Sequence, residues 1–174
     1  MFNNIFNNDD MIKFQNQLKE NNQTITSAES CTGGLISSMI TEISGSSSIF
    51  KGSVITYSNE IKEQELNVKK ETIIKYGVVS CEVVEEMLNG ALKKFNADFA
   101  MAVSGVAGPT GGTKNKPVGT VVIGVKDKKG MKEISIYRFK GDRKEIQNQA
   151  AKTALKKNFE ILFKKTWQMF LFLL

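Results

Sequence analysis

The fold class is decided by the sequence TITSAESCTGGLISSMITEI, which occupies residues 24–43. Residues 24–28 have the composition of a short strand, and residues 35–43 repeat apolar side chains at helical spacing. Between them lies a loop of small residues that contains Gly33 and Gly34. The order strand, glycine-rich turn, helix predicts an α/β protein.

The rest of the chain continues this alternation of strands and helices. Strands are expected at residues 52–57, 98–103, 119–125 and 134–139, and helices at 12–20, 58–66, 81–95 and 144–163. The last two strands flank a turn at residues 127–130, so they should form a hairpin. The alternation predicts an α/β sandwich, and the late hairpin makes its sheet mixed rather than purely parallel.

The length and charge of the chain limit what it can be. A chain of 174 residues is long enough for one domain with a real core, so we expect a single domain over residues 1–174. The formal charge is +6, but the lysines are scattered and aromatic residues do not interleave with them. Such a surface can draw small phosphorylated anions to a cleft, and the alternative is a solvated lysine-rich surface without a function. Nucleic-acid binding is an alternative that rests on charge alone, without a recognised motif.

No histidine occurs anywhere in the sequence, and this absence excludes several kinds of chemistry. Ser-His-Asp catalysis, imidazole bases and histidine-containing zinc sites all require it. Cys31 and Cys81 are the only cysteines, and they form no C-x-x-C motif. Neither a disulfide framework nor a thiolate metal site is therefore expected, which fits a protein of the reducing cytoplasm.

The two ends of the chain give no sign of export or membrane insertion. Residues 1–11 lack both the basic start and the apolar run of a signal peptide. Residues 167–174 are strongly apolar, but this segment is far shorter than the roughly 20 residues that a membrane helix needs. We expect it to pack on the body of the domain or on a second subunit, with a homodimer as the favoured assembly.

The segment TSAESCTGG at residues 26–34 holds the first candidate for chemistry. Its central serine, Ser30, lies on a sharp turn between the strand and the helix, where free backbone N–H groups and the helix dipole favour negative charge. Such a position suits an oxyanion or a bound phosphate. The alternative is an ordinary helix cap with two glycines that allow a tight turn.

A lysine in the segment GSVITYSNEIK at residues 52–62 is the second candidate. Lys62 lies one helical turn beyond Ser58, so it can point back over the end of the strand, where Tyr57 lies. Without histidine a serine nucleophile needs another base, and a desolvated lysine is the usual substitute. Taken alone, a lysine on a helix is nearly always surface charge.

Two further segments offer groups that bind anions. The loop VSGVAGPTGGT at residues 103–113 exposes successive backbone N–H groups, and its hydroxyls can complete an anion nest. The segment FKGDR at residues 139–143 ends a strand and opens the last helix, where Arg143 can hold a carboxylate or a phosphate. Both have a plain alternative, because connecting loops are often rich in glycine and an isolated arginine proves little.

Six segments, in their order along the chain, together resemble the C-terminal domain family of the CinA (competence/damage-inducible) proteins: TSAESCTGG, GSVITYSNEIK, GVVS, AVSGVAGPTGG, KPVGTV and GDR. The resemblance is strongest over residues 24–154. It implies a three-layer α/β/α sandwich and an amidohydrolase that converts nicotinamide mononucleotide to nicotinate mononucleotide and ammonia, with no metal or other cofactor. Longer family members carry an additional N-terminal domain, so this chain resembles the stand-alone form.

The resemblance also implies roles for individual residues. Ser30 matches the nucleophile of the family and Lys62 its base, with Tyr57 beside them in the catalytic set. The residues expected to bind the substrate are Glu29, Thr32, Gly33, Ser104, Gly105, Thr110 and Arg143. Backbone N–H groups of residues 31–34 are expected to hold the oxyanion that forms on the substrate.

Two alternatives to this function remain open from the sequence. Cys31 is a rival nucleophile, because a thiol is intrinsically more reactive than a hydroxyl. A second alternative is a regulatory module that binds a phosphate or a nucleotide without catalysis. Both keep a small nucleotide as the partner of the domain, and neither involves nucleic acid or a membrane.

Overall fold

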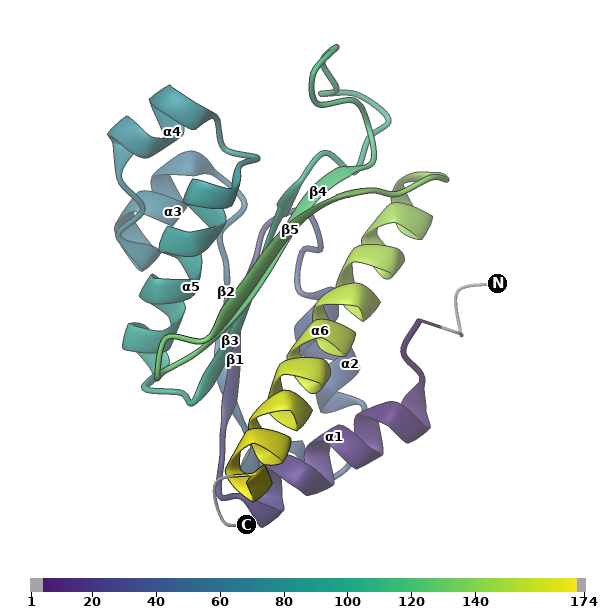
Figure 1. The fold of residues 1–174 in the computed structure, drawn as a ribbon. Helices are drawn as coiled ribbons and strands as arrows, with labels where there is room; N and C mark the ends of the chain where they lie inside the picture. Colours follow the sequence, from purple (N-terminus) through teal and green to yellow (C-terminus); the bar gives the residue numbers. More distant parts are fainter. Residues whose placement is uncertain (1–4, 172–174) are drawn as a thin grey trace.

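The computed structural model describes residues 5–171, with side chains to residue 163, and a mixed sheet of five strands forms its centre (Figure 1). The strands are β1 Ile25–Glu29, β2 Phe50–Ile55, β3 Phe99–Gly105, β4 Thr120–Asp127 and β5 Lys132–Arg138, in the spatial order β2-β1-β3-β4-β5. β1 runs parallel to both β2 and β3, whereas β4 and β5 are antiparallel to their neighbours. The mixed sheet and the late hairpin predicted from the sequence are confirmed.

Helices cover both faces of this sheet and make the fold three-layered (Figure 1). One face carries α1, α2 and α6, and the other carries α3, α4 and α5. The bounds are Asn8–Glu20, Leu35–Thr41 and Arg143–Leu171 for the first face, and Asn59–Leu66, Lys70–Tyr76 and Cys81–Phe95 for the second. A short 3-10 turn, Ser46–Ser48, precedes β2. The α/β/α sandwich is therefore confirmed.

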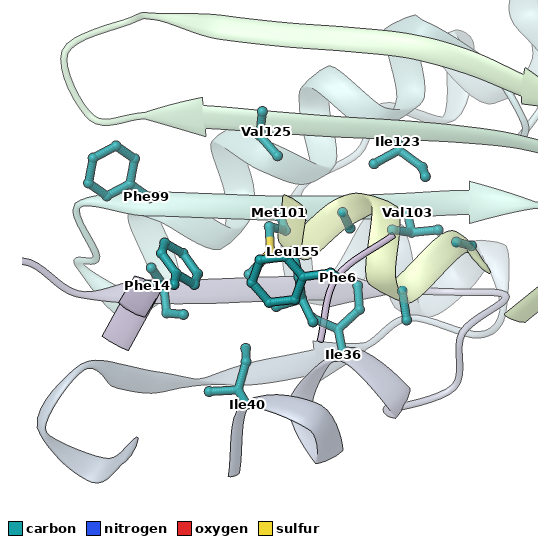
Figure 2. Close-up of a cluster of buried hydrophobic side chains, with 14 of the residues drawn as sticks. Phe6, Phe14, Ile36, Ile40, Phe99, Met101, Val103, Ile123, Val125 and Leu155 are labelled. Carbon is teal, nitrogen blue, oxygen red and sulfur yellow. The ribbon is translucent and has the colours of Figure 1, made fainter. Parts of the chain in front are cut away.

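The central strand β3 shows why both faces need a helical layer. Its side chains alternate between the two faces of the sheet. Phe99, Met101 and Val103 pack into one buried cluster with residues of α1, α2 and α6 (Figure 2). Ala100 and Ala102 belong to a second cluster, which residues of α5 cover. A strand buried on both sides is a continuous apolar run in the sequence, and this is why it was predictable.

The helices differ from the sequence expectation mainly at their ends. α1 begins at Asn8 because Asn7 and Asp10 form a capping box, in which each side chain accepts a hydrogen bond from the backbone of the other. α4 was not predicted, since none of its residues is buried and it shows no strong apolar pattern. The packing expected for residues 167–174 lies outside the described side chains. No helix within residues 5–171 is long and apolar enough to cross a membrane.

α3 and α5 approach each other closely at Gly90. A Cβ atom at this position would lie 2.2 Å from the carbonyl oxygen of Leu66, the last residue of α3. Bonded neighbours apart, carbon atoms do not come so close to an oxygen, so the position excludes every side chain. The distance between these two helices therefore depends on a glycine.

The parallel strands β1 and β2 lead to opposite faces of the sheet. The chain leaves β1 for α2 on one face, and it leaves β2 for α3 on the other. Neighbouring strands that diverge in this way leave a crevice beyond their carboxyl ends, which is where open α/β sheets bind ligands. The same edge of the sheet also receives the end of β3 and, after β5, the first residue of α6.

Candidate active site

A cavity of about 220 Å³ lies at this edge of the sheet. Its lining comes from the segments that follow β1 and β2, from α3, from the segment before α5, from the end of β3 and the loop after it, and from α6: Ser30, Cys31, Tyr57, Asn59, Lys62, Val78, Val79, Ser104, Gly105, Ala107 and Arg143. A wider depression of about 530 Å³ lies between α3 and α5, lined by charged side chains such as Glu85 and Glu86. Those two carboxylates are engaged by Lys132 and by Thr72, and none of the residues predicted for the site lines this depression.

Ser30 is held in the cavity by the turn that follows β1. Its backbone N–H donates to the carbonyl oxygen of Val103 at 3.1 Å, which continues the pairing of β1 with β3 by one residue. The chain then reverses through Gly33 and Gly34, whose φ values of 62° and 102° are conformations that side chains rarely adopt. The glycines therefore allow the sharp turn that the sequence predicted at Ser30.

Lys62 reaches the same point from the other side. It is the fourth residue of α3, which begins after the N-cap Ser58, and its side chain is only 1% exposed. The Nζ atom lies 3.1 Å from Ser30 Oγ and 2.6 Å from the carbonyl oxygen of Thr56, with the carbonyl of Ser58 at 3.5 Å. Burial lowers the pKa of Lys62 from 10.5 to about 8. A substantial neutral fraction is therefore present near neutral pH.

The three contacts of Lys62 Nζ can be made by either charge state of the lysine, and only the neutral amine leaves a lone pair for Ser30. A neutral amine has two N–H donors and one lone pair, whereas an ammonium has three donors and none. The carbonyls of Thr56 and Ser58 accept the two N–H groups, and the lone pair then remains for the hydroxyl proton of Ser30. In this state Ser30 donates to the lysine, which is the geometry that general-base activation of a serine requires.

Cys31 follows Ser30 and also lines the cavity, but its thiol is not activated as a nucleophile. Burial raises the pKa of Cys31 to about 12, against the opposing influence of its own backbone N–H, Lys62 and Arg143. A thiol with such a pKa is protonated near neutral pH and is a poor nucleophile. The carbonyl of Cys31 accepts a 2.7 Å hydrogen bond from Gln147 of α6, which ties the turn to that helix.

Arg143 closes the cavity at its outer side. Its Nη2 donates to the hydroxyl of Tyr57 at 2.7 Å, and its Nη1 donates to the carbonyl of Gly108 at 2.6 Å. Tyr57 is 62% exposed, so the arginine joins a projecting aromatic ring to the loop between β3 and β4. The first residue of α6 is thus positioned to meet an anionic group that enters the cavity.

Six of the residues predicted for the site come together in the cavity: Ser30, Lys62, Tyr57, Ser104, Gly105 and Arg143. Ser104 donates its hydroxyl to the carbonyl of Val78 at 2.9 Å and so joins β3 to the segment before α5. Val78, Val79, Ala107 and Asn59 also line the cavity and were not predicted. Both valines belong to the segment GVVS, which is one of the six segments that resemble the family, and this was the only signal in the sequence that pointed to them.

Four residues that were predicted to bind substrate do not line the cavity. Glu29 is fully buried behind the turn and uses both carboxylate oxygens in internal hydrogen bonds, while Thr32 donates its hydroxyl to Glu29. Gly33 and Thr110 are exposed outside the cavity. Glu29 and Thr32 are buried because they hold the turn in shape, and buried polar groups must be paired within the protein.

The start of α2 also differs from the expectation. The N–H groups of Gly34, Ile36 and Ser37 are already bound to the carboxylate of Glu29, so they are not free for an oxyanion or a phosphate. Among the described residues, no backbone carbonyl accepts from the N–H of Cys31, which interacts with its own thiol. The predicted oxyanion donors at residues 31–34 are thereby reduced to the beginning of that range.

Among residues 5–163, no group of three or more Cys, Asp or Glu side chains could hold a metal ion. What remains is an α/β domain in which a buried lysine meets a serine hydroxyl beyond the carboxyl ends of parallel strands. The CinA C-terminal domain matches residues 9–162, and the chain belongs to this family.

Relatives with about half of their aligned residues identical support the assignment. The CinA-like protein of Endomicrobium trichonymphae is 50% identical over 151 residues, which are 86% of this chain and 35% of that protein. The CinA-like protein of Fervidobacterium nodosum is 54% identical over 133 residues, which are 76% of this chain and 32% of that protein. The chain therefore spans about a third of the length of these relatives.

Solved structures have the same fold. The competence/damage inducible protein CihA from Agrobacterium tumefaciens superposes with a TM-score of 0.85 at 37% identity, covering 87% of this chain and 92% of its own. A CinA superfamily protein from Klebsiella pneumoniae gives a TM-score of 0.84 at 33% identity, covering 88% and 96%. Both superpositions cover nearly the whole of the solved chains, so the similarity extends over the complete domain.

Proposed function

We propose that this domain hydrolyses the amide of nicotinamide mononucleotide to nicotinate mononucleotide and ammonia, with Ser30 as nucleophile and Lys62 as its base. One observation carries the proposal. Lys62 Nζ is almost completely buried, lies 3.1 Å from Ser30 Oγ and has only neutral carbonyls as its other partners. A lysine in these surroundings is poised to accept a proton, because no anion holds it in the charged form.

The reaction follows from this geometry in two halves. Lys62 takes the proton of Ser30 while the serine oxygen attacks the carboxamide carbon. The resulting ammonium then gives its proton to the amide nitrogen of the tetrahedral intermediate, the carbon–nitrogen bond breaks and ammonia leaves. Water attacks the acyl-enzyme in the second half, with Lys62 again as base, and the serine is regained. The N–H of Cys31, the residue after the nucleophile, is the donor we assign to the oxyanion, as in other hydrolases that carry their serine on a sharp turn.

The charge of the substrate fits a lysine base. The pyridinium ring carries a positive charge next to the reacting amide, and a cation beside Lys62 favours its neutral form. The phosphate of the nucleotide is assigned to Arg143, which already lies at the outer side of the cavity. A small nucleotide with a cationic ring and an anionic phosphate therefore matches the two ends of the site.

Ser30 is preferred over Cys31 as the nucleophile for two reasons. The amine of Lys62 contacts the hydroxyl of Ser30, and burial keeps the thiol of Cys31 protonated by raising its pKa to about 12. We expect Cys31→Ala to keep most of the turnover and Ser30→Ala to lose it, as measured by ammonia release. The reverse pattern would transfer the nucleophile to Cys31.

The experiment that tests the function measures ammonia released by purified protein from nicotinamide mononucleotide, with free nicotinamide as the second substrate. We expect release from the nucleotide, little from the free amide and none from the Ser30→Ala protein. If calorimetry shows that the nucleotide binds while no ammonia appears, the domain is a non-catalytic nucleotide-binding module and the proposed activity is wrong.

A further inference from the structure

Glu29 is a charged residue in the interior that the reaction does not use. It is the last residue of β1, directly precedes Ser30, and is 0% exposed. One carboxylate oxygen, Oε2, accepts from Thr32 Oγ1 at 2.8 Å, Gly34 N at 3.0 Å and Ile36 N at 3.1 Å. The other, Oε1, accepts from Ser37 N at 2.9 Å and Ser37 Oγ at 2.6 Å. The donors match a carboxylate that only accepts hydrogen bonds.

No cation balances this buried charge among the described side chains. An unpaired carboxylate in the interior is unfavourable unless several donors replace its water. Here the donors are the first N–H groups of α2, which have no partner within the helix and lie at its positive end. Gly34 at the N-cap position has no side chain that could cap α2, so the carboxylate of Glu29 caps the helix from inside the protein.

The same contacts enclose the turn that carries Ser30. The carbonyl of Glu29 accepts a 2.7 Å hydrogen bond from Thr56 N, which fixes this residue to the end of β2. Its side chain holds residues beyond Ser30, from Thr32 to Ser37. Glu29 is therefore attached twice: its backbone carbonyl is bound to the end of β2, and its carboxylate is bound to residues 32–37. Ser30 lies in the short segment between Glu29 and these residues.

We propose that Glu29 is a positioning residue, whose buried carboxylate fixes the turn so that Ser30 Oγ lies opposite Lys62 Nζ. A second consequence follows from its occupation of the helix start. The anionic part of a substrate has no free N–H groups there and is left to Arg143, which lines the cavity. The inference rests on the proposed Ser30–Lys62 pair, but not on the identity of the amide substrate.

The test uses a fluorophosphonate probe, which reports the reactivity of Ser30 without a natural substrate. Ser30 Oγ forms a bond to phosphorus, the phosphorus–fluorine bond breaks, fluoride leaves, and Lys62 takes the hydroxyl proton. Glu29→Gln keeps the shape of the side chain but puts an amide NH₂ against donors. Because a misplacement of about 1 Å can reduce a rate a hundred-fold, we expect labelling to slow by roughly ten- to a hundred-fold.

A second variant covers the case in which Glu29→Gln fails to fold. Thr32→Val is nearly isosteric and removes only the hydroxyl that donates to Glu29 Oε2. It should slow labelling by a smaller factor and in the same direction. The pH at which labelling reaches half its maximum should stay at the wild-type value in both variants, because positioning does not change the basicity of Lys62. A shifted midpoint would mean that Glu29 acts through its charge, and would overturn the proposal.

The matched control is Asp98→Asn, which alters a carboxylate that holds the opposite end of β1. We expect it to lower the unfolding temperature without slowing the labelling of folded protein. Equal labelling losses in Asp98→Asn and Glu29→Gln at equal loss of stability would reduce Glu29 to a structural role. Wild-type labelling without ammonia release would remove only the proposed substrate, whereas no labelling of wild-type Ser30 would overturn both proposals.

Discussion

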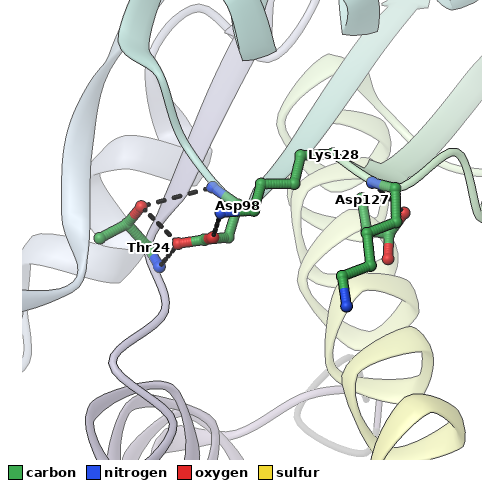
Figure 3. Close-up of polar contacts among 5 residues, drawn as sticks. Thr24, Asp98, Asp127 and Lys128 are labelled. Carbon is green, nitrogen blue, oxygen red and sulfur yellow. Dashed lines mark hydrogen bonds and ion pairs between the residues drawn. The ribbon is translucent and has the colours of Figure 1, made fainter.

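The charged side chains at the two ends of β1 differ in whether they have a partner of opposite charge. Before the strand begins, Asp98 accepts hydrogen bonds from the backbone and the hydroxyl of Thr24 at 2.8 and 3.0 Å, and its other oxygen lies 2.6 Å from Lys128 Nζ (Figure 3). Burial alone would raise the pKa of Asp98, but the Lys128 and Thr24 contacts outweigh it and the pKa lies below its ordinary value. The carboxylate of Asp98, the hydroxyl of Thr24 and the amine of Lys128 thus each have a partner that favours its usual state.

At the other end of β1, Lys62 is buried without an anion. Its amine meets a serine hydroxyl and backbone carbonyls, and burial lowers its pKa to about 8. Paired charges thus stabilise the Asp98 end of the strand. At the Ser30 end, a buried lysine without an ionic partner is ready to take part in proton transfer. Sites that depart from the usual pairing of charges are where chemistry is expected.

The largest expected effect comes from replacing the residues of the Ser30–Lys62 pair. Ser30→Ala and Lys62→Met should each lower kcat by about 10³-fold or more, because both act in the same proton transfer. The double variant should be little worse than either single one, since residues that act as a unit give non-additive losses. Ammonia release in single-turnover experiments measures this. Losses that multiply would show two independent contributions.

Arg143→Ala should have the next largest effect, on binding rather than on chemistry. A charge-assisted contact is worth about 1.5–3 kcal/mol, so kcat/KM should fall by roughly ten- to a hundred-fold, mainly through KM. Steady-state kinetics with the nucleotide and with its riboside separate the two contributions. The riboside lacks the phosphate and should be affected little. Equal damage to both substrates would assign Arg143 to the amide or to the fold of Tyr57 and Gly108.

The pH dependence gives a third, smaller effect. Only neutral Lys62 can act as base, so kcat/KM should fall by about tenfold per pH unit below the pKa of about 8 and level off above it. A value of kcat/KM that keeps rising to pH 10 would show that the pKa of Lys62 is not lowered.

The same pKa predicts a change in stability. The folded pKa of about 8 lies below the ordinary value of 10.5, so between these values the unfolded chain binds more protons. The free energy of unfolding should therefore rise with pH across this window. Denaturant unfolding of wild type and Lys62→Met measures the contribution as a difference, because the variant should lack this rise.

The smallest effect on activity is expected at the paired end of β1. Asp98→Asn should leave kcat/KM unchanged and lower the free energy of unfolding by about 1–2 kcal/mol, mainly through the Thr24 hydrogen bonds, because the exposed pair with Lys128 adds little. The difference between wild type and variant should shrink as pH falls through the lowered pKa of Asp98. A loss of turnover in fully folded protein would show that the two ends of the strand are coupled.

Local patterns predicted the parts of the fold and site that depend on neighbours in sequence. The strand, turn and helix around Ser30, the late hairpin and the reach of Lys62 back over Ser58 all follow from spacings of a few residues. The parallel order of the strands does not, because it depends on which edges pair. The contact between Arg143 and Tyr57 joins residues 86 positions apart and has no local signal.

The contacts of Glu29 could not be predicted from the sequence for a related reason. The family resemblance implied a contact with substrate, but the side chain of a strand residue points to one face of the sheet, whereas the chain beyond it turns. Its carboxylate consequently meets the start of α2 instead of the cavity. A sequence shows that a charged residue is present near a site, and only the direction of its side chain shows what the charge does.

Gly90 has a consequence for how this protein tolerates mutation. It sets the separation of α5 from α3, and α3 carries Lys62 one turn before the contact at Leu66. Any larger residue must push α3 outward, and the amine at the centre of the proposed chemistry would move with it. In a library of random variants selected for turnover, position 90 should therefore be depleted as strongly as a residue that touches substrate, although it does not line the cavity and has no functional group.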